Sequence, residues 1–315
     1  MIEMMRTPDE RFYGLPGYPY EPNYMEINGG RFHYLDEGEG EVILCLHGEP
    51  TWSYLYRKMI PPLKKNYRVI APDFFGFGRS DKFTKIKDYS FYLHYRTLTK
   101  FIERAGLKDI TLVCQDWGGL IGLSVVGKHP EWFKRVVIMN TSLPTGNRSL
   151  PLSFKLWRTF SKYWPSLPIR NIMKWGTYRT PQLQVLSAYE APFPDEKYKA
   201  GARAWPSLVP TNPKDDGVRQ MKRARAVLKE WDKPALVMFS EDDPITKGAE
   251  RWFMENIPTV KDEPEIIIER AGHFLQEDQG KKLAEHIHDF ILRSHARERG
   301  EEIVLDPEKY PTKKK

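Results

Sequence analysis

One ten-residue stretch constrains the fold of this chain more than any other: residues 110–119 read ITLVCQDWGG. An apolar run ends abruptly in polar residues and two glycines, and a helical pattern follows from Leu120 to Lys128. A strand, one sharp turn and a helix in this order are the layout of a nucleophile elbow, which presents the side chain at its apex. The motif therefore predicts a strand–turn–helix unit with the carboxylate of Asp116 at its tip.

Asp116 takes the place at which a serine hydrolase would carry its serine. A carboxylate is already ionised at neutral pH, so it needs no base to activate it and can attack an electrophilic carbon directly, forming an ester. The same residue could instead be an ordinary aspartate that caps the helix, since such caps are common. The elbow motif alone leaves both interpretations open.

Two later apolar runs lead into the residue types that would complete a catalytic triad. Residues 235–240 read ALVMFS and precede Glu-Asp-Asp-Pro-Ile, whereas residues 265–269 precede Arg-Ala-Gly-His-Phe. Residues just past the carboxyl ends of parallel strands meet at one edge of the sheet, where ligands bind. We therefore expect His273 to act as general base and Asp243 to orient its ring, in the nucleophile–acid–base order of α/β-hydrolases.

The acid of this triad has neighbours that could replace it. Glu241 and Asp242 directly precede Asp243, and three acids in a row are more often a solvated loop. A single histidine in a glycine-flanked loop is likewise more often a surface residue than a catalyst. Asp243 is preferred because it stands immediately before Pro244, where the loop turns toward the next helix.

A fourth strand end supplies candidate donors for an oxyanion hole. Residues 42–46 read VILCL and are followed by His-Gly-Glu-Pro-Thr-Trp. In this fold, a backbone N–H of that loop and the N–H of the residue after the nucleophile form the hole. We expect these donors to be the N–H groups of Glu49 and Trp117, which would hold the oxyanion formed when water attacks the Asp116 ester. His47 is interpreted as structural.

The order of periodic segments predicts a mostly parallel eight-stranded sheet flanked by helices. Together with the order of the triad residues, it leads us to expect an α/β-hydrolase fold. Between roughly 144 and 228 the strand patterns vanish, and Pro, Trp and short amphipathic stretches dominate. This range is expected to be a helical cap inserted into a core formed by 1–143 and 229–315. The expected segments are a hairpin of 24–28 and 31–36, strands near 42–46, 67–71, 110–115, 133–140, 235–240 and 265–269, and helices near 53–65, 91–105, 118–129, 246–256 and 279–297.

Composition indicates one catalytic chain rather than a nucleic-acid-binding or membrane protein. The formal charge is +7, but Lys and Arg are interleaved with acids and form no basic stripe with stacking aromatics. Cys45 and Cys114 fall inside predicted strands, as small buried hydrophobes rather than a disulfide or metal site. No apolar run approaches the roughly 18–20 residues of a spanning helix, and no secretory signal is evident, so a cytoplasmic location is expected.

Five motifs, in their order and spacing, resemble the haloalkane dehalogenase family: HGEPTW, PDFFGFGRSDK, VCQDWGG, SEDDPIT and AGHFLQE. The likeness covers essentially the whole chain, and the subfamily with the acid after the later strand is the closer match. It implies hydrolysis of a carbon–halogen bond to an alcohol, a halide and a proton, without cofactor or metal. The implied partners are a small halogenated aliphatic substrate, the halide ion and water, with the chain a monomer or weak homo-oligomer.

The resemblance also implies two halide-binding tryptophans. These carry over as Trp117, beside the nucleophile, and Trp157 in the cap stretch FKLWR, with Trp164 and Trp175 as alternatives for the second. The assignment makes physical sense, because a halide expelled into a dry pocket is costly without donors. Indole N–H groups donate and carry no acceptor atom that would repel the anion.

Two rival functions remain open at this point. An epoxide hydrolase would use the same Asp nucleophile and His–Asp pair, and would need acids to protonate the epoxide oxygen, commonly two cap tyrosines. The candidates are Tyr163, Tyr178, Tyr189 and Tyr198. The other rival is a non-enzymatic binding module on a hydrolase fold, which an intact triad argues against.

Overall fold

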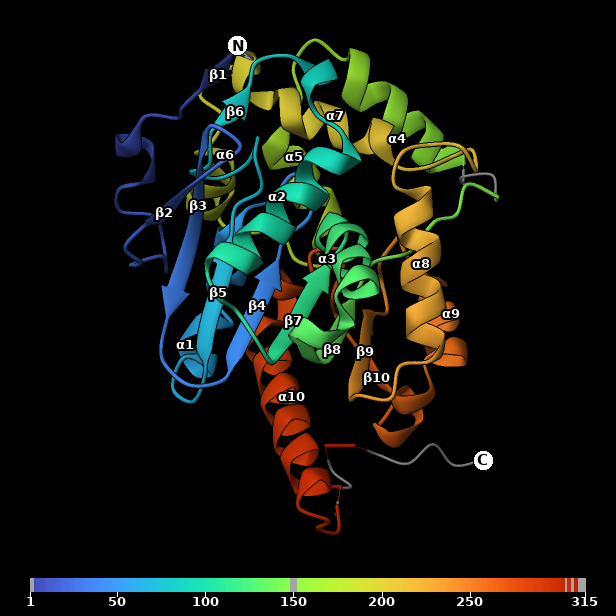
Figure 1. Ribbon diagram of the computed structural model, residues 1–315. Helices are drawn as coiled ribbons and strands as arrows, with labels where there is room; N and C mark the ends of the chain where they lie inside the picture. Colours follow the sequence, from blue (N-terminus) through green and yellow to red (C-terminus); the bar gives the residue numbers. More distant parts are fainter. Residues whose placement is uncertain (1–2, 148–151, 304, 307–308, 311–315) are drawn as a thin grey trace.

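An eight-stranded sheet forms the centre of the molecule (Figure 1), a computed structural model that describes residues 3–147, 152–303, 305–306 and 309–310. A separate two-stranded sheet joins β1 to β6 near the amino terminus. The strands are β1 Met4–Met5, β2 Asn23–Ile27, β3 Gly30–Glu37, β4 Val42–Leu46, β5 Arg68–Pro72, β6 Lys82–Phe83, β7 Ile110–Gln115, β8 Phe133–Met139, β9 Ala235–Ser240 and β10 Ile266–Ile268.

The strand order of the large sheet is β10-β9-β8-β7-β4-β5-β3-β2. All neighbouring pairs from β10 to β5 are parallel, whereas β3 and β2 add to the edge as an antiparallel hairpin. Every residue of β7 is buried, as expected for a central parallel strand covered on both faces. The mostly parallel eight-stranded sheet expected from the sequence is therefore confirmed.

Helices pack on both faces of this sheet. On one face, α3 (Trp117–Lys128) packs between α2 (Phe91–Arg104) and α8 (Val218–Lys229), as Figure 1 shows. On the other face, α10 (Leu275–Glu298) packs against α1 (Ile60–Leu63). The remaining core helix, α9, spans Glu250–Asn256 and contacts β9. None of the helices in these described ranges is long and apolar enough to cross a membrane.

Three helices differ from their expected bounds. The helix expected over 53–65 is two short pieces, a 3₁₀ turn at Ser53–Tyr56 and α1, whose second and third residues are prolines and lack N–H donors. The helix expected from 246 begins at Glu250, after Gly248 with a positive φ of 90°. The last helix begins at Leu275, four residues before the expected start.

The described part of the segment between β8 and β9 contains helices joined by loops and no strand. It contains α4 Leu152–Tyr163, α5 Ile169–Gly176, α6 Leu183–Glu190, α7 Ala200–Leu208 and α8. In Figure 1, α4, α5 and α7 lie beyond the carboxyl ends of the central strands. The predicted cap, 144–228, includes most of α8, which nevertheless packs on α3 of the core: a Cβ at Gly127 would lie 2.6 Å from the Cα of Ala224.

Candidate active site

Asp116 sits at a strained turn between β7 and α3. Its φ of 49° and ψ of −123° lie outside the regions that non-glycine residues ordinarily occupy. Two hydrogen bonds hold the turn, because the Asp116 N–H donates to Asn140 O at 2.9 Å and the Thr141 hydroxyl donates to Asp116 O at 2.6 Å. This is the structural context that the elbow motif requires.

The glycines around Asp116 are sterically required. A Cβ at Gly48 would lie 2.3 Å from Oδ1 of Asp116, and one at Gly118 would lie 2.1 Å from Leu46 O. Contacts this short do not occur between real atoms, so any side chain would push the loop or helix away. The glycines bring the carboxylate, the loop between β4 and the 3₁₀ turn at Ser53–Tyr56, and the start of α3 into one compact site.

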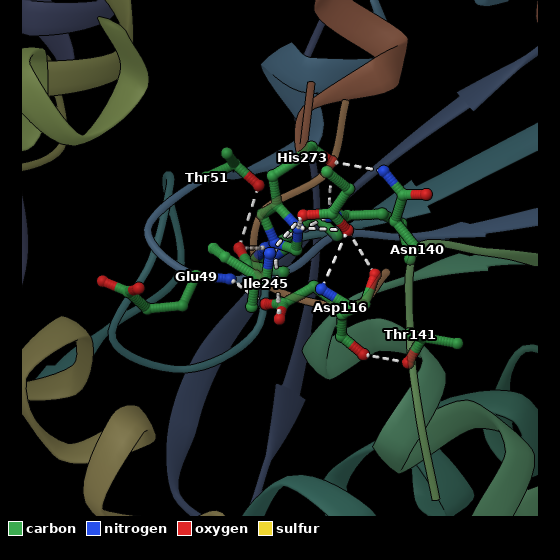
Figure 2. Close-up of polar contacts among 12 residues, drawn as sticks. Glu49, Thr51, Asp116, Asn140, Thr141, Ile245 and His273 are labelled. Carbon is green, nitrogen blue, oxygen red and sulfur yellow. Dashed lines mark hydrogen bonds and ion pairs between the residues drawn. The ribbon is translucent and has the colours of Figure 1, made fainter. Parts of the chain in front are cut away.

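Three side chains from separate strand ends meet at this point. His273, after β10, places Nδ1 3.1 Å from both carboxylate oxygens of Asp243, which follows β9. Nε2 of the same ring lies 3.6 Å from Oδ2 of Asp116. Figure 2 shows His273 facing the carboxylate of Asp116. The structure thus brings together the three residues that the sequence proposed as a triad, while Glu241 and Asp242 are exposed.

Burial and charge set the protonation of this trio. Burial opposes ionisation of Asp243, yet His273, the Thr246 hydroxyl and the Ile245 N–H together keep the pKa of the Asp243 carboxyl below its ordinary value. Burial would lower the pKa of His273, but Asp243 and then Asp116 raise it to about 10. The two carboxylates therefore favour a protonated ring as long as both are charged.

Only one of the two expected oxyanion donors makes a hydrogen bond to Asp116 in this structure. The Glu49 N–H donates to Oδ1 of Asp116 at 2.8 Å, as Figure 2 shows. Trp117 directly follows Asp116 as the first residue of α3. The Glu49 side chain is itself buried, and burial, followed by the charge of Asp116, raises the pKa of its carboxyl well above the ordinary value. A protonated Glu49 adds no second negative charge beside Asp116.

The sequence analysis missed two residues that hold His273. Gln115 Nε2 donates to the His273 carbonyl at 3.1 Å and lies 3.1 Å from His273 Nε2. Asn140, at the end of β8, donates through Nδ2 to the carbonyls of Gly272 and His273, each at 3.1 Å. Asn140 could have been identified, because the rule that parallel strand ends meet at one edge applies to β8 as well.

The two proposed halide-binding tryptophans stack on different aromatic rings. Trp117 is buried, and its ring stacks on Trp205 of α7 with centroids 5.0 Å apart. Trp157 is half-buried in α4 and stacks on Phe160 at 5.8 Å. Because α4 packs against α7, Trp157 belongs to the helix next to Trp205. The two alternatives, Trp164 and Trp175, are 55% and 64% exposed.

No group of three or more His, Cys, Asp or Glu side chains among the described residues could hold a metal ion. Cys45 and Cys114 are buried and free, inside β4 and β7.

His47, interpreted as structural, is buried, and both of its ring nitrogens lie at main-chain groups. Nε2 accepts the Phe74 N–H at 3.0 Å, and Nδ1 lies 3.0 Å from Gly48 O. The site therefore consists of carboxylates, one histidine, backbone donors and indoles.

Comparisons with known proteins agree with this arrangement. Residues 41–279 match the family model of the alpha/beta hydrolase fold. A haloalkane dehalogenase of Psychrobacter cryohalolentis is 45% identical over 92% of this chain and 98% of its own length. Haloalkane dehalogenase 1 of Mycobacterium tuberculosis is 46% identical over 90% of this chain and 97% of its own. The solved tetrameric haloalkane dehalogenase DpaA from Paraglaciecola agarilytica superposes with a TM-score of 0.84 at 39% identity, over 90% and 97% of the two chains.

Proposed function

The chain belongs to the haloalkane dehalogenase family and is a hydrolase acting on carbon–halide bonds; we propose that it carries out this hydrolysis in two steps at Asp116. The substrate class is a small halogenated aliphatic molecule, and the products are an alcohol, a halide and a proton. The observation that carries the proposal is the carboxylate of Asp116 at the elbow, facing the buried His273–Asp243 pair.

In the first step, Asp116 displaces the halide. Its Oδ1 accepts the Glu49 N–H, which leaves Oδ2 to attack the carbon that carries the halogen. A carbon–oxygen bond forms as the carbon–halogen bond breaks, and the halide leaves with the bonding electron pair. The result is an alkyl ester on Asp116, and no proton moves in this step.

In the second step, water hydrolyses this ester with His273 as general base. Esterification removes the negative charge of Asp116, one of the two groups that raise the pKa of His273. The ring then loses its proton more readily and can accept one from the attacking water. Asp243 stabilises the imidazolium that forms, and the N–H groups of Glu49 and Trp117 hold the oxyanion. The alcohol leaves, Asp116 becomes a carboxylate again, and the proton passes to solvent.

We assign the departing halide to the indole N–H groups of Trp117 and Trp157. The position of Trp117 beside the nucleophile supports the first assignment. For the second, the exposure of Trp164 and Trp175 argues against these alternatives. Trp205 is closer to Trp117, but its N–H donates to His94 at 2.7 Å and is already engaged.

Three of the four candidate tyrosines give the epoxide alternative little support. Tyr163 and Tyr178 are 70% and 49% exposed, so their hydroxyls lie largely in solvent. The hydroxyl of Tyr189 donates to Glu277 at 2.7 Å, within a buried ion pair. The family relationship disfavours the non-enzymatic alternative as well.

Incubation with 1,2-dibromoethane and, separately, with 1,2-epoxybutane tests the proposal. We expect bromide release by the wild-type protein, no diol from the epoxide, and no bromide release by Asp116→Ala, since no other group at the elbow can form the ester. Undiminished bromide release by freshly purified Asp116→Ala would overturn the assignment of the nucleophile. Diol formation without bromide would overturn the substrate class.

We also propose that the chain is a cytoplasmic monomer or weak homo-oligomer. One similar solved structure is described as tetrameric, so the alternative is a stable tetramer. Light scattering on the purified chain over a range of concentrations distinguishes the two, because a weak oligomer dissociates on dilution.

A further inference from the structure

Trp205 occupies the centre of an aromatic cluster beside the candidate site. It lies in α7 and is fully buried. Its ring stacks on Trp117 at 5.0 Å with an interplanar angle of 29°, and packs on Phe77 at 4.2 Å. The indole of Trp117, whose N–H we assign to the halide, therefore rests on the plane of Trp205.

A buried hydrogen bond fixes this plane. The Trp205 N–H donates to Nε2 of His94 at 2.7 Å, and His94 is itself fully buried in α2. Burial lowers the pKa of His94 to about 3, so the ring is neutral and Nε2 keeps the lone pair that accepts the indole N–H. On its other side, the imidazole stacks on Tyr89 at 6.0 Å with an interplanar angle of 17°.

This pair is a buried polar contact within a cluster of aromatic rings. A buried indole N–H needs a partner, and a phenylalanine at this place would need none. His94 satisfies that N–H through Nε2, although its own Nδ1 has no hydrogen-bond partner among the described residues.

We propose that His94 and Trp205 are positioning residues for dehalogenation: their hydrogen bond fixes the ring plane of Trp205, and this plane holds the indole of Trp117 in the orientation that binds the halide. The proposal rests on the proposed halide-binding function of Trp117. It extends the active site by two residues outside the triad, and it links α2 of the core to α7 of the inserted segment.

The test uses variants that remove or keep the acceptor. His94→Leu removes it, whereas His94→Gln keeps an acceptor of similar reach and should rescue. The matched control is Thr97→Val, which removes another buried side-chain partner in α2, the hydroxyl that accepts from Asn28 at 3.1 Å. All three variants retain the nine tryptophans of the chain, so bromide binding can be followed by quenching of intrinsic fluorescence.

We expect His94→Leu to raise the bromide dissociation constant and to slow the release of bromide in a single turnover, each by about tenfold, the size of effect typical of one lost buried hydrogen bond. Hydrolysis of the ester, measured in the same experiment, should change less than about twofold, because the His273–Asp243 pair is untouched. If His94 had only a structural role, its loss would not slow bromide release more than hydrolysis of the ester. His94→Gln should recover most of the loss, and Thr97→Val should resemble the wild type.

Trp205→Phe provides a second measurement that does not depend on His94 variants folding. It should slow bromide release to a similar extent, and the double variant with His94→Leu should be no slower than the slower single variant, since both remove the same bond. The positioning role is overturned if the wild type releases bromide and a folded His94→Leu or Trp205→Phe protein releases it at the same rate. It is also overturned if Thr97→Val shows a defect as large as that of His94→Leu. Absence of bromide release by the wild type would instead overturn the proposed function itself.

Discussion

His273 enters the proposed reaction only after the ester on Asp116 exists, so its removal should separate the two steps. A His273→Phe variant is expected to release one halide per active site and then stop, because no base remains for the hydrolytic water. Mass spectrometry of the intact protein should show the added alkyl group, and peptide analysis should place it on Asp116. Asp116→Ala is the control, which should gain no mass. A His273→Phe protein that binds substrate but traps no adduct would contradict the two-step mechanism.

Trp157 is the least constrained residue of the proposed site, since its ring stacks on Phe160 of its own helix, α4. Trp157→Phe keeps most of the ring volume and removes only the N–H. Loss of one donor to an anion should weaken bromide binding by about 1.5–3 kcal/mol, roughly a ten- to hundredfold change in dissociation constant. Fluorescence quenching by bromide measures it, with the exposed Trp164→Phe and Trp175→Phe as matched controls. A loss in either control rather than in Trp157→Phe would move the assignment to that residue.

At the scale of elements, a hydrogen bond to a buried ion pair of the core joins the inserted helices to the core. Glu277, in the first turn of α10, accepts two hydrogen bonds from Arg57 at 2.6 and 2.8 Å. It also accepts the Tyr189 hydroxyl of α6 at 2.7 Å. Burial opposes ionisation of Glu277, but Arg57 and Lys58 hold its pKa below the ordinary value. The contact ties α6 to the helix that begins two residues after His273.

Two substitutions should show how much each partner in this contact contributes to the free energy of unfolding. Tyr189→Phe removes one hydrogen bond and should lower the free energy of unfolding by about 1–3 kcal/mol. Glu277→Ala leaves the buried Arg57 without its partner, and should lower it by about 3–5 kcal/mol. Urea denaturation measures both, with Ser187→Ala on the exposed side of α6 as the control. Equal stability of Tyr189→Phe and wild type would show that this contact adds nothing to the attachment of α6.

The central strands could be predicted because each is a continuous apolar run bounded by a turn, which is how β4, β7 and β9 read in the sequence. The triad followed from the same pattern, since Asp116, Asp243 and His273 each come just after such a run. Local sequence patterns predict less about features that depend on tertiary contacts. The hydrogen bond between His94 and Trp205 joins residues 111 positions apart on two helices, and neither residue stands out within its own helix. The contact between these two side chains depends on how α7 is placed relative to α2, which sequence periodicity does not specify.

For the molecule as a whole, the buried ionisable groups affect stability at alkaline pH in opposite directions. His273 has its pKa raised to about 10, so between its ordinary value near 6.5 and pH 10 the folded chain holds a proton that the unfolded chain has lost. This contribution is fully present below pH 6.5 and disappears as the pH rises through 10. Lys82 is also buried, and burial lowers its pKa to about 7. Between about pH 7 and 10.5 the unfolded chain therefore holds a proton that the folded chain has lost, so the contribution of Lys82 to the free energy of unfolding rises with pH. These two groups therefore oppose each other in the wild type between about pH 7 and 10.

Comparison of the wild type with His273→Gln isolates the histidine, because Lys82 titrates alike in both proteins. Between pH 7 and 9.5, the free energy of unfolding of the wild type minus that of the variant should fall by up to about 1.4 kcal/mol per pH unit, the slope for one proton. Urea denaturation at half-unit steps of pH measures the difference directly. Parallel curves for the two proteins would show that Asp116 and Asp243 do not hold a proton on His273 in the free enzyme. In that case His273 would already be a neutral base before the ester forms, and loss of the charge on Asp116 would not be needed to make it one.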